Sequence, residues 1–286
     1  MLNIEKLSKR PKVFKTLSGL TPEQFTKLVN EILPLWKKAE YKRKNWKGRK
    51  RVIGGGRRKN LNLAQSIFTL LLYYRSYASQ AFIGLIVGLD DSNVSRYVRQ
   101  IEPYLAKVFK VPKKKIKLTE QEIWDLIVDA TEQPSQKRKG SGYSGKKKRY
   151  TIKTQIHINT QGFIKSVSQS VPGNIHDKKL YDQSQTYLFN ARDGTADKMD
   201  IKKLGDLGYV GTECHIPKKK LQDRPLMMHE LYFNKKHSKK RVPVEHTLAH
   251  LKKWRILEDK FRNGVSRYNL IFRNIAGLRN FILATD

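Results

Sequence analysis

The spacing of hydrophobic residues predicts helices in the first part of the chain and strands in the second. Apolar side chains recur every three or four positions from Phe25 to Trp36 and again over residues 63–101, as on the buried side of amphipathic helices. Further along they run continuously or alternate, as in strands. The basic segment Val111-Pro112-Lys113-Lys114-Lys115 is typical of a linker. We therefore predict an all-helical domain over residues 1–116 and an α/β domain over residues 117–286.

The first long helix begins with a recognisable capping sequence. In Thr21-Pro22-Glu23-Gln24, Thr21 can act as the N-cap, Pro22 suits the first helical position, and Gln24 closes a capping box. We expect Pro34 to kink this helix or to shorten it. The preceding 20 residues are basic and weakly patterned, and residues 41–60 form a basic, glycine-containing loop.

Residues 61–109 predict three helices with short joints, in the order of a helix-turn-helix domain. The second helix begins at Ser79 and ends at Gly88, and its apolar residues are Phe82, Leu85 and Ile86. The third is capped by Asp91 or Ser92, and Pro103 should bend or end it. An ordinary helical hairpin with a solvated face is the alternative. The outward side chains of the third helix that could touch bases or phosphates are Asn93, Ser95, Arg96 and Arg99.

Residues 124–133 predict a strand that is apolar on both faces and so belongs in the middle of a sheet covered by helices. Asp129 falls at the end of the apolar run. A charged carboxylate there is costly to desolvate unless a metal, a base or water compensates. Asp129 as the cap of the following turn is the alternative.

The elements that follow complete an α/β pattern. We predict strands over residues 150–159, 163–171 and 202–206, and helices over 176–185, 244–254 and 267–283. Three antiparallel strands, a helix, a fourth strand and closing helices are the order of the ribonuclease-H-like fold, a mixed sheet flanked by helices. In that fold the first and fourth strands are neighbours, so Asp129 should lie beside Asp206.

The charge of the chain points to a polyanionic partner. The 59 Lys and Arg residues against 25 Asp and Glu residues give a net charge of +34, which opposes compaction unless a polyanion neutralises it. Nucleic acid bound through its phosphates is the expected partner. A solvated loop or hairpin tip is the alternative for each basic run. Further basic side chains predicted to contact DNA are Arg57, Arg58, Lys59, Lys146, Lys147, Lys148, Arg149, Arg241 and Lys252.

A membrane surface is the other anionic option, but no apolar run approaches the roughly 20 residues of a spanning helix. The N-terminus has no signal-peptide core. The one cysteine, Cys214, excludes intrachain disulfides and cysteine-cluster zinc sites, and it suits a reducing compartment. We expect a cytoplasmic, nucleoid-associated protein.

Carboxylates in three separate elements predict a metal site. Two carboxylates a few Å apart repel unless a divalent cation lies between them. Asp129 beside Asp206 therefore suits phosphoryl transfer with two Mg²⁺ or Mn²⁺ ions. Glu245 is the expected third ligand, because it lies next to the buried stripe of the 244–254 helix. A salt bridge of Glu245 within its own helix is the alternative.

Three other groups have simpler interpretations. Asp177 suits the first turn of its helix, with a supporting role near the site as the alternative. Glu132 is not needed for the metal site and either supports it or faces solvent. His246 and His250 have a zinc-compatible spacing, but no third ligand is evident.

Together these motifs resemble the DDE transposases of bacterial insertion sequences, in the group related to Harbinger elements. The matching stretches are Val128–Thr131, Tyr143–Gln155, Pro172–Asp177, Gly205–Tyr209 and Val244–Lys252, in the family's order. Two positions depart from it. Ser238 stands where related proteins have the tyrosine of a Tyr-Arg-Glu-Lys signature, and Tyr150 replaces a histidine.

The resemblance implies that Asp129, Asp206 and Glu245 are the metal ligands. It also implies cleavage at terminal inverted repeats and joining of the freed 3′-hydroxyl to target DNA. Cutting two ends implies a homodimer in the active complex. A domesticated or inactive DNA-binding relative is the main alternative, and an RNA-associated protein would explain the charge but not the three acids.

Overall fold

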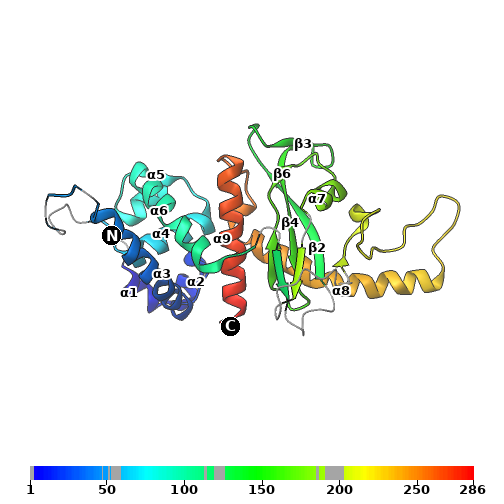
Figure 1. Cartoon of the computed structure of the whole chain (residues 1–286), viewed down its shortest axis with the longest axis horizontal. Helices are drawn as coiled ribbons and strands as arrows, with labels where there is room; N and C mark the ends of the chain where they lie inside the picture. The colour runs from blue at the N-terminus through cyan, green and yellow to red at the C-terminus, as the bar shows by residue number, and fades with distance from the viewer. Residues whose placement is uncertain are drawn as a thin grey trace. The chain divides into compact units, whose positions relative to one another are not determined.

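The computed structural model (Figure 1) describes residues 3–46, 48–50, 52, 59–112, 115–118, 126–184, 187–190 and 203–286. By its internal contacts the chain divides into two compact units. The first comprises Met1–Lys110, Trp254–Ile256 and Ala284–Asp286, and the second Val111–Lys253 and Leu257–Leu283. Arg57 and Arg58, which are predicted to contact DNA, and residues 124–125 of the predicted central strand lie outside the described residues.

The first unit is helical, as predicted. Its helices are α1 (Ile4–Ser8), α2 (Pro11–Ser18), α3 (Pro22–Lys44), α4 (Leu63–Ser76), α5 (Gln80–Val87) and α6 (Asp91–Phe109). Phe14, Phe25 and Phe68 meet edge to face at its centre, with ring centroids 5.2 to 5.9 Å apart. Phe14 is fully buried there, and this tertiary contact supports α2 in a stretch whose sequence pattern predicted no helix.

The capping box of Thr21 and Gln24 begins α3 as predicted. The prediction that Pro34 would shorten α3 is wrong, because the helix runs on to Lys44. Leu28 and Ile32, which precede the proline in the same helix, are fully buried, and their packing offsets the lost backbone hydrogen bond.

The helix-turn-helix order over α4, α5 and α6 is present. Ser79 Oγ accepts a hydrogen bond from the Phe82 amide, and Gly88 ends α5 in the left-handed conformation with φ of 71°. The N-cap of α6 is Asp90, one residue before the predicted pair, and α6 continues through Pro103 to Phe109 instead of ending there. The apolar residues predicted for α5 are largely exposed, and Ile83, Gly84 and Val87 are buried in their place.

The second unit contains the predicted mixed sheet. Its strands are β2 (Leu126–Pro134), β3 (Gly142–Ser144), β4 (Arg149–Ile158), β5 (Ile164–Val167), β6 (Val171–Pro172) and β8 (Lys203–Leu204). Among the described residues the order is β3-β4-β2-β8, and β5 and β6 also pair with β4. A separate parallel pair joins β1 (Lys115–Leu118) to β7 (Tyr187–Asn190).

One strand prediction and one alternative need correction. The strand expected over residues 163–171 is divided into β5 and β6, which both pair with β4 and are separated by residues 168–170 outside any strand. The alternative for Asp129, a cap of the following turn, is wrong, because β2 stays paired with β4 as far as Pro134. The backbone of Asp129 is therefore held inside a ladder rather than at the start of a turn.

Helices cover both faces of the sheet. Among the helices of this unit are α7 (Asp177–Ser184), α8 (Met228–Lys252) and α9 (Val265–Leu283), with a short 3₁₀ turn at Leu207–Tyr209. In Figure 1, α9 lies along one face of the sheet and α7 lies on the other. Asn280 of α9 pairs with both backbone groups of Ile164 in β5 at 2.8 Å.

The prediction that α8 starts at Val244 is wrong, since it begins at Met228. Glu230 closes this N-terminus through a 2.8 Å hydrogen bond from the Met227 amide to its Oε2. The first half of α8 buries little more than His237, so it has no apolar stripe that a sequence pattern could show. None of the helices in the described ranges is long and apolar enough to span a membrane.

Candidate active site

The parallel pairing of β2 with β8 brings Asp129 and Asp206 to the same level of the sheet. Ile127 is opposite Leu204 in this ladder, and each aspartate follows two residues later in its own strand direction. Residues in register in a parallel pair project from the same face. The first and fourth predicted strands are therefore neighbours, as expected, and both carboxylates lie just beyond the last residues paired between β2 and β8.

Asp129 is largely buried, with 17% of its side chain exposed. Its Oδ1 accepts a 2.8 Å hydrogen bond from the Ala130 amide, and its Oδ2 accepts one of 3.3 Å from Nη2 of Arg241. Burial raises the pKa of Asp129 from its ordinary 3.8 to about 6. The Arg241 charge and the Ala130 amide act against this rise, and the charges of Asp206 and Asp177 add to it. An additional cation at this point would favour the ionised carboxylate.

Asp206 is held by the turn that follows it. Its Oδ1 accepts a 2.9 Å hydrogen bond from the Gly208 amide, which caps the 3₁₀ turn Leu207–Tyr209. Tyr209, the last residue of this turn, is buried, and its hydroxyl donates a hydrogen bond to Oε1 of Gln155 at 3.4 Å. Burial, together with the charges of Asp129, Asp177 and Asp206, raises the pKa of Tyr209 well above its ordinary value. Tyr209 therefore stays a neutral donor beside the carboxylates.

Glu245 lies on α8, one helical turn beyond Arg241, and is exposed. In the structure as described, no contact joins Glu245 to Asp129 or Asp206. No three His, Cys, Asp or Glu side chains in the described ranges are close enough to hold a metal ion together. The two aspartates suit a hydrated divalent cation, whose preferred ligands are carboxylate and water oxygens. Glu245 as the third ligand stays a prediction.

A third carboxylate, Asp177, approaches this site from the start of α7. A Cβ atom added at Gly208 would lie 2.6 Å from Oδ2 of Asp177 and 3.0 Å from Oδ1 of Asp206. The two oxygens therefore face the same space from different elements. Asp177 is the first residue of its helix, as predicted, but it also faces the site. Glu132 does not face solvent, because 13% of its side chain is exposed and it is paired with Lys153.

The predicted DNA-contacting residues of this unit divide into two groups. Lys146, Lys147, Lys148 and Arg149 are exposed in the hairpin between β3 and β4, and Lys252 is exposed near the end of α8. Arg241, in contrast, is engaged with Asp129 and has 13% of its side chain exposed. Its guanidinium faces the carboxylates of the site, and its Nε is buried without a hydrogen-bond partner in the described part of the chain.

Sequence reasoning missed a cavity of about 220 Å³ next to β8. Its lining includes Leu204, Phe233 and the exposed cations Lys236 and Lys240. The run Lys235-Lys236-His237-Ser238-Lys239-Lys240 is the signal that could have found it.

In the helical unit, Arg96 and Arg99 are exposed on α6, whereas Asn93 and Ser95 are half-buried. Arg96 also donates to Oδ1 of Asn93 at 3.2 Å. Lys59, predicted to contact phosphates, forms a 3.0 Å ion pair with Glu40 and lies over the ring of Trp36.

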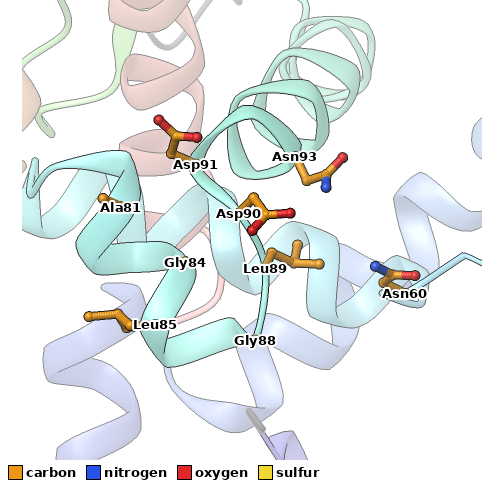
Figure 2. Close-up of a pocket in the computed structure, with 9 residues that line it drawn as sticks. All are labelled: Asn60, Ala81, Gly84, Leu85, Gly88, Leu89, Asp90, Asp91 and Asn93. Carbon is orange, nitrogen blue, oxygen red and sulfur yellow. The ribbon is translucent and has the colours of Figure 1, made fainter.

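A cavity of about 550 Å³ lies where α5 turns into α6 (Figure 2). Its lining is Asn60, Ala81, Gly84, Leu85, Gly88, Leu89, Asp90, Asp91 and Asn93. Gly84 is required here, because a side chain at this position would collide with the Leu89 carbonyl. Asp90 and Asp91 place negative charge at the N-terminal end of α6, which disfavours phosphate binding there. Arg96 and Arg99 provide exposed positive charge further along the same helix.

Comparisons with known proteins agree on one family. The family model described as DDE superfamily endonuclease matches residues 127–280. A protein of Microchaete diplosiphon, named as a transposase for insertion sequence element IS702, is 31% identical over 95% of this chain and 94% of its own length. A protein of Streptomyces albus G, named as a transposase for element IS112, is 26% identical over 87% of both chains. No solved structure matches the chain significantly.

Proposed function

We propose that this chain, which belongs to the DDE superfamily endonucleases, is a transposase that cuts DNA at terminal inverted repeats and joins the freed 3′-hydroxyl to target DNA. The observation that carries the proposal is the juxtaposition of Asp129 and Asp206 across β2 and β8. Both named relatives, which match most of this chain, are described as insertion-sequence transposases, and this supports the proposal.

Asp129 and Asp206 would hold the divalent cations, with Glu245 as the third ligand. Two Mg²⁺ or Mn²⁺ ions held there would activate a water or 3′-hydroxyl for attack and stabilise the leaving oxygen. Arg241 favours the ionised form of Asp129, against the effect of burial, and positions its carboxylate, because the guanidinium lies 3.3 Å from Oδ2. Glu245 is favoured as the third ligand because it lies one turn from Arg241 on the same helix.

DNA binding would use exposed basic residues that are not paired with the carboxylates of the site. The net charge of +34 supports attraction to DNA phosphates, and exposed cations lie on α6, on the β3–β4 hairpin and along α8. We assign end recognition to α6 through Arg96 and Arg99. The hairpin residues Lys146–Arg149 would grip the backbone near the site. Two ends would be cut by a homodimer on the bacterial nucleoid.

The test is cleavage of an inverted-repeat DNA by the full chain with Mg²⁺ or Mn²⁺. Asp129→Asn, Asp206→Asn and Glu245→Gln should each abolish strand cleavage and leave end binding largely intact. Asp223→Asn, an exposed position with the same change of charge, is the matched control and should cut normally. Cleavage at the wild-type rate by any of the first three variants would remove that residue from the proposed ligand set.

A second candidate function is DNA binding without cleavage. It is favoured by the position of Glu245, which makes no contact with Asp129 or Asp206 among the described residues. In that case the chain would bind inverted repeats with a strong salt dependence, and added Mg²⁺ or Mn²⁺ would produce no nicked product.

A further inference from the structure

Lys153 is a buried cation that the proposed chemistry does not use. It lies in the middle of β4, and 8% of its side chain is exposed. Its Nζ is 3.2 Å from Oε1 of Glu132 and 3.0 Å from Oδ1 of Asp177, and it donates a 2.7 Å hydrogen bond to the Ile175 carbonyl. A buried ammonium group is tolerated only with such partners. Lys153 therefore joins β4, β2 and the start of α7.

The contact of Lys153 with Asp177 fixes one oxygen and leaves the other directed toward the site. Oδ1 of Asp177 is buried beside Lys153 but has no aligned hydrogen-bond donor in the described part of the chain. The contact is thus electrostatic, while the aligned donation goes to Ile175. Oδ2 lies within 3.0 Å of the point where a Gly208 side chain would begin, as does Oδ1 of Asp206.

Asp177 and Asp206 approach each other just beyond the end of β8. Side-chain alternation places Glu132 and Lys153 on the opposite face of β2 and β4 from Asp129. Pairing of β8 with β2 stops at Leu204, and Asp206 and Gly208 follow where the ladder has ended. Asp177 reaches Asp206 at that place, and its charge also acts on Asp129 and on Tyr209.

The charges in this cluster do not cancel one another. Asp129, Asp177, Asp206 and Glu132 supply four carboxylates, and the paired cations are Arg241 and Lys153. When all four acids are ionised, four negative charges against two positive ones leave a net charge of −2, which favours the binding of divalent cations. Mg²⁺ usually keeps several of its waters, so a carboxylate near the ion can act by accepting hydrogen bonds from them.

We propose that Asp177, fixed by Lys153, is a positioning carboxylate that strengthens binding of the divalent cation at Asp129 and Asp206. The proposal rests on the proposed function, because it assumes that the pair binds a cation. Asp177 acts there through its charge and through the cation's water. Lys153 acts through Asp177, by holding its side chain against Gly208.

The experiment is titration of the full chain with Mn²⁺ by calorimetry, alone and with a DNA duplex. Asp177→Asn should weaken Mn²⁺ binding by roughly 10- to 100-fold, the range found when outer-shell partners of metal ligands are removed. Asp182→Asn is the matched control, since it lies on the same helix, is exposed and carries the same charge change. It should leave Mn²⁺ affinity unchanged. Lys153→Arg keeps the cation and should retain most of the affinity.

A second readout separates this role from a merely structural one. The gain in melting temperature on adding Mn²⁺ should shrink in Asp177→Asn, whatever the melting temperature in chelator. A variant that only loosened α7 would melt earlier in chelator and keep the full Mn²⁺-dependent gain, and that result would overturn the proposal.

The outcomes also separate this inference from the proposed function. Unchanged Mn²⁺ affinity in Asp177→Asn, with loss of affinity in Asp129→Asn, would refute the role of Asp177 alone. Unchanged affinity in both variants, or no Mn²⁺ binding by the wild-type chain with or without DNA, would refute the cation site and the inference together.

Discussion

Replacing Asp129 by asparagine should stabilise the protein at neutral pH while removing its proposed activity. Asparagine has the shape of the protonated aspartate but no charge to desolvate. The folded-state pKa of Asp129 is raised from 3.8 to about 6, so the stability that its protonated form provides is fully present below pH 3.8. This stability is lost as the pH rises through about 6.

The magnitude follows from the shift in pKa. Each pKa unit corresponds to about 1.4 kcal/mol, so the ionised carboxylate lowers the free energy of unfolding by about 3 kcal/mol above pH 7. The figure already contains the opposing attraction of Arg241. For a unit of this size, about 3 kcal/mol corresponds to a rise in melting temperature of roughly 6 to 12 °C.

The assay is calorimetric melting of both proteins in chelator at pH 4.5, 5.5, 6.5 and 7.5. The advantage of Asp129→Asn should grow across this series and level off near pH 7. Asp182→Asn, which is exposed, should show no such growth. An advantage that is the same at every pH, or a disadvantage at pH 7.5, would refute the reasoning that burial raises the pKa of Asp129.

Three further predictions concern the neighbours of this site and the DNA interface. Lys153→Met should lower the free energy of unfolding by about 3 to 5 kcal/mol in chemical denaturation, because it leaves buried carboxylates unpaired. The exposed control Lys148→Met should change this free energy by less than about 0.5 kcal/mol. Equal effects of the two substitutions would contradict the burial of Lys153. Gly208→Ala should weaken Mn²⁺ binding measured by calorimetry, since the methyl group enters the space between Asp177 and Asp206; unchanged affinity would mean that the cation binds elsewhere. If Arg99 contacts a phosphate, Arg99→Ala should weaken binding to inverted-repeat DNA and reduce the slope of log affinity against log salt concentration by about 1. An unaltered slope would mean that the DNA binds on another surface.

Elements with a local signal were predicted well from the sequence. The capping box at Thr21, the cap at Ser79 and the left-handed Gly88 depend on residues within a few positions of one another. The proximity of Asp129 and Asp206 followed from matching the order of the elements to the ribonuclease-H-like fold, in which the first and fourth strands are adjacent. These features are readable without any knowledge of side-chain packing.

Features that depend on distant contacts were not predicted. The first half of α8 has no apolar stripe, and helices α3 and α6 pass through prolines because their buried faces hold them in place. Lys153 belongs to an alternating strand whose polar side would ordinarily face water. Its burial depends on α7 covering that face, which no pattern within the strand reveals.

The position of Asp129 inside β2, rather than at its end, restricts how this protein can change over generations. Side chains alternate between the faces of a strand, so inserting or deleting one residue before Asp129 in β2 would turn it to the opposite face. Inserting or deleting one residue at Gly145, in the exposed hairpin between β3 and β4, leaves the pairing of β2 unchanged. A side chain at Gly145 would contact nothing within 4 Å. Changes in length should therefore accumulate in the connections of the sheet, while the central strand keeps its length in every copy that remains active.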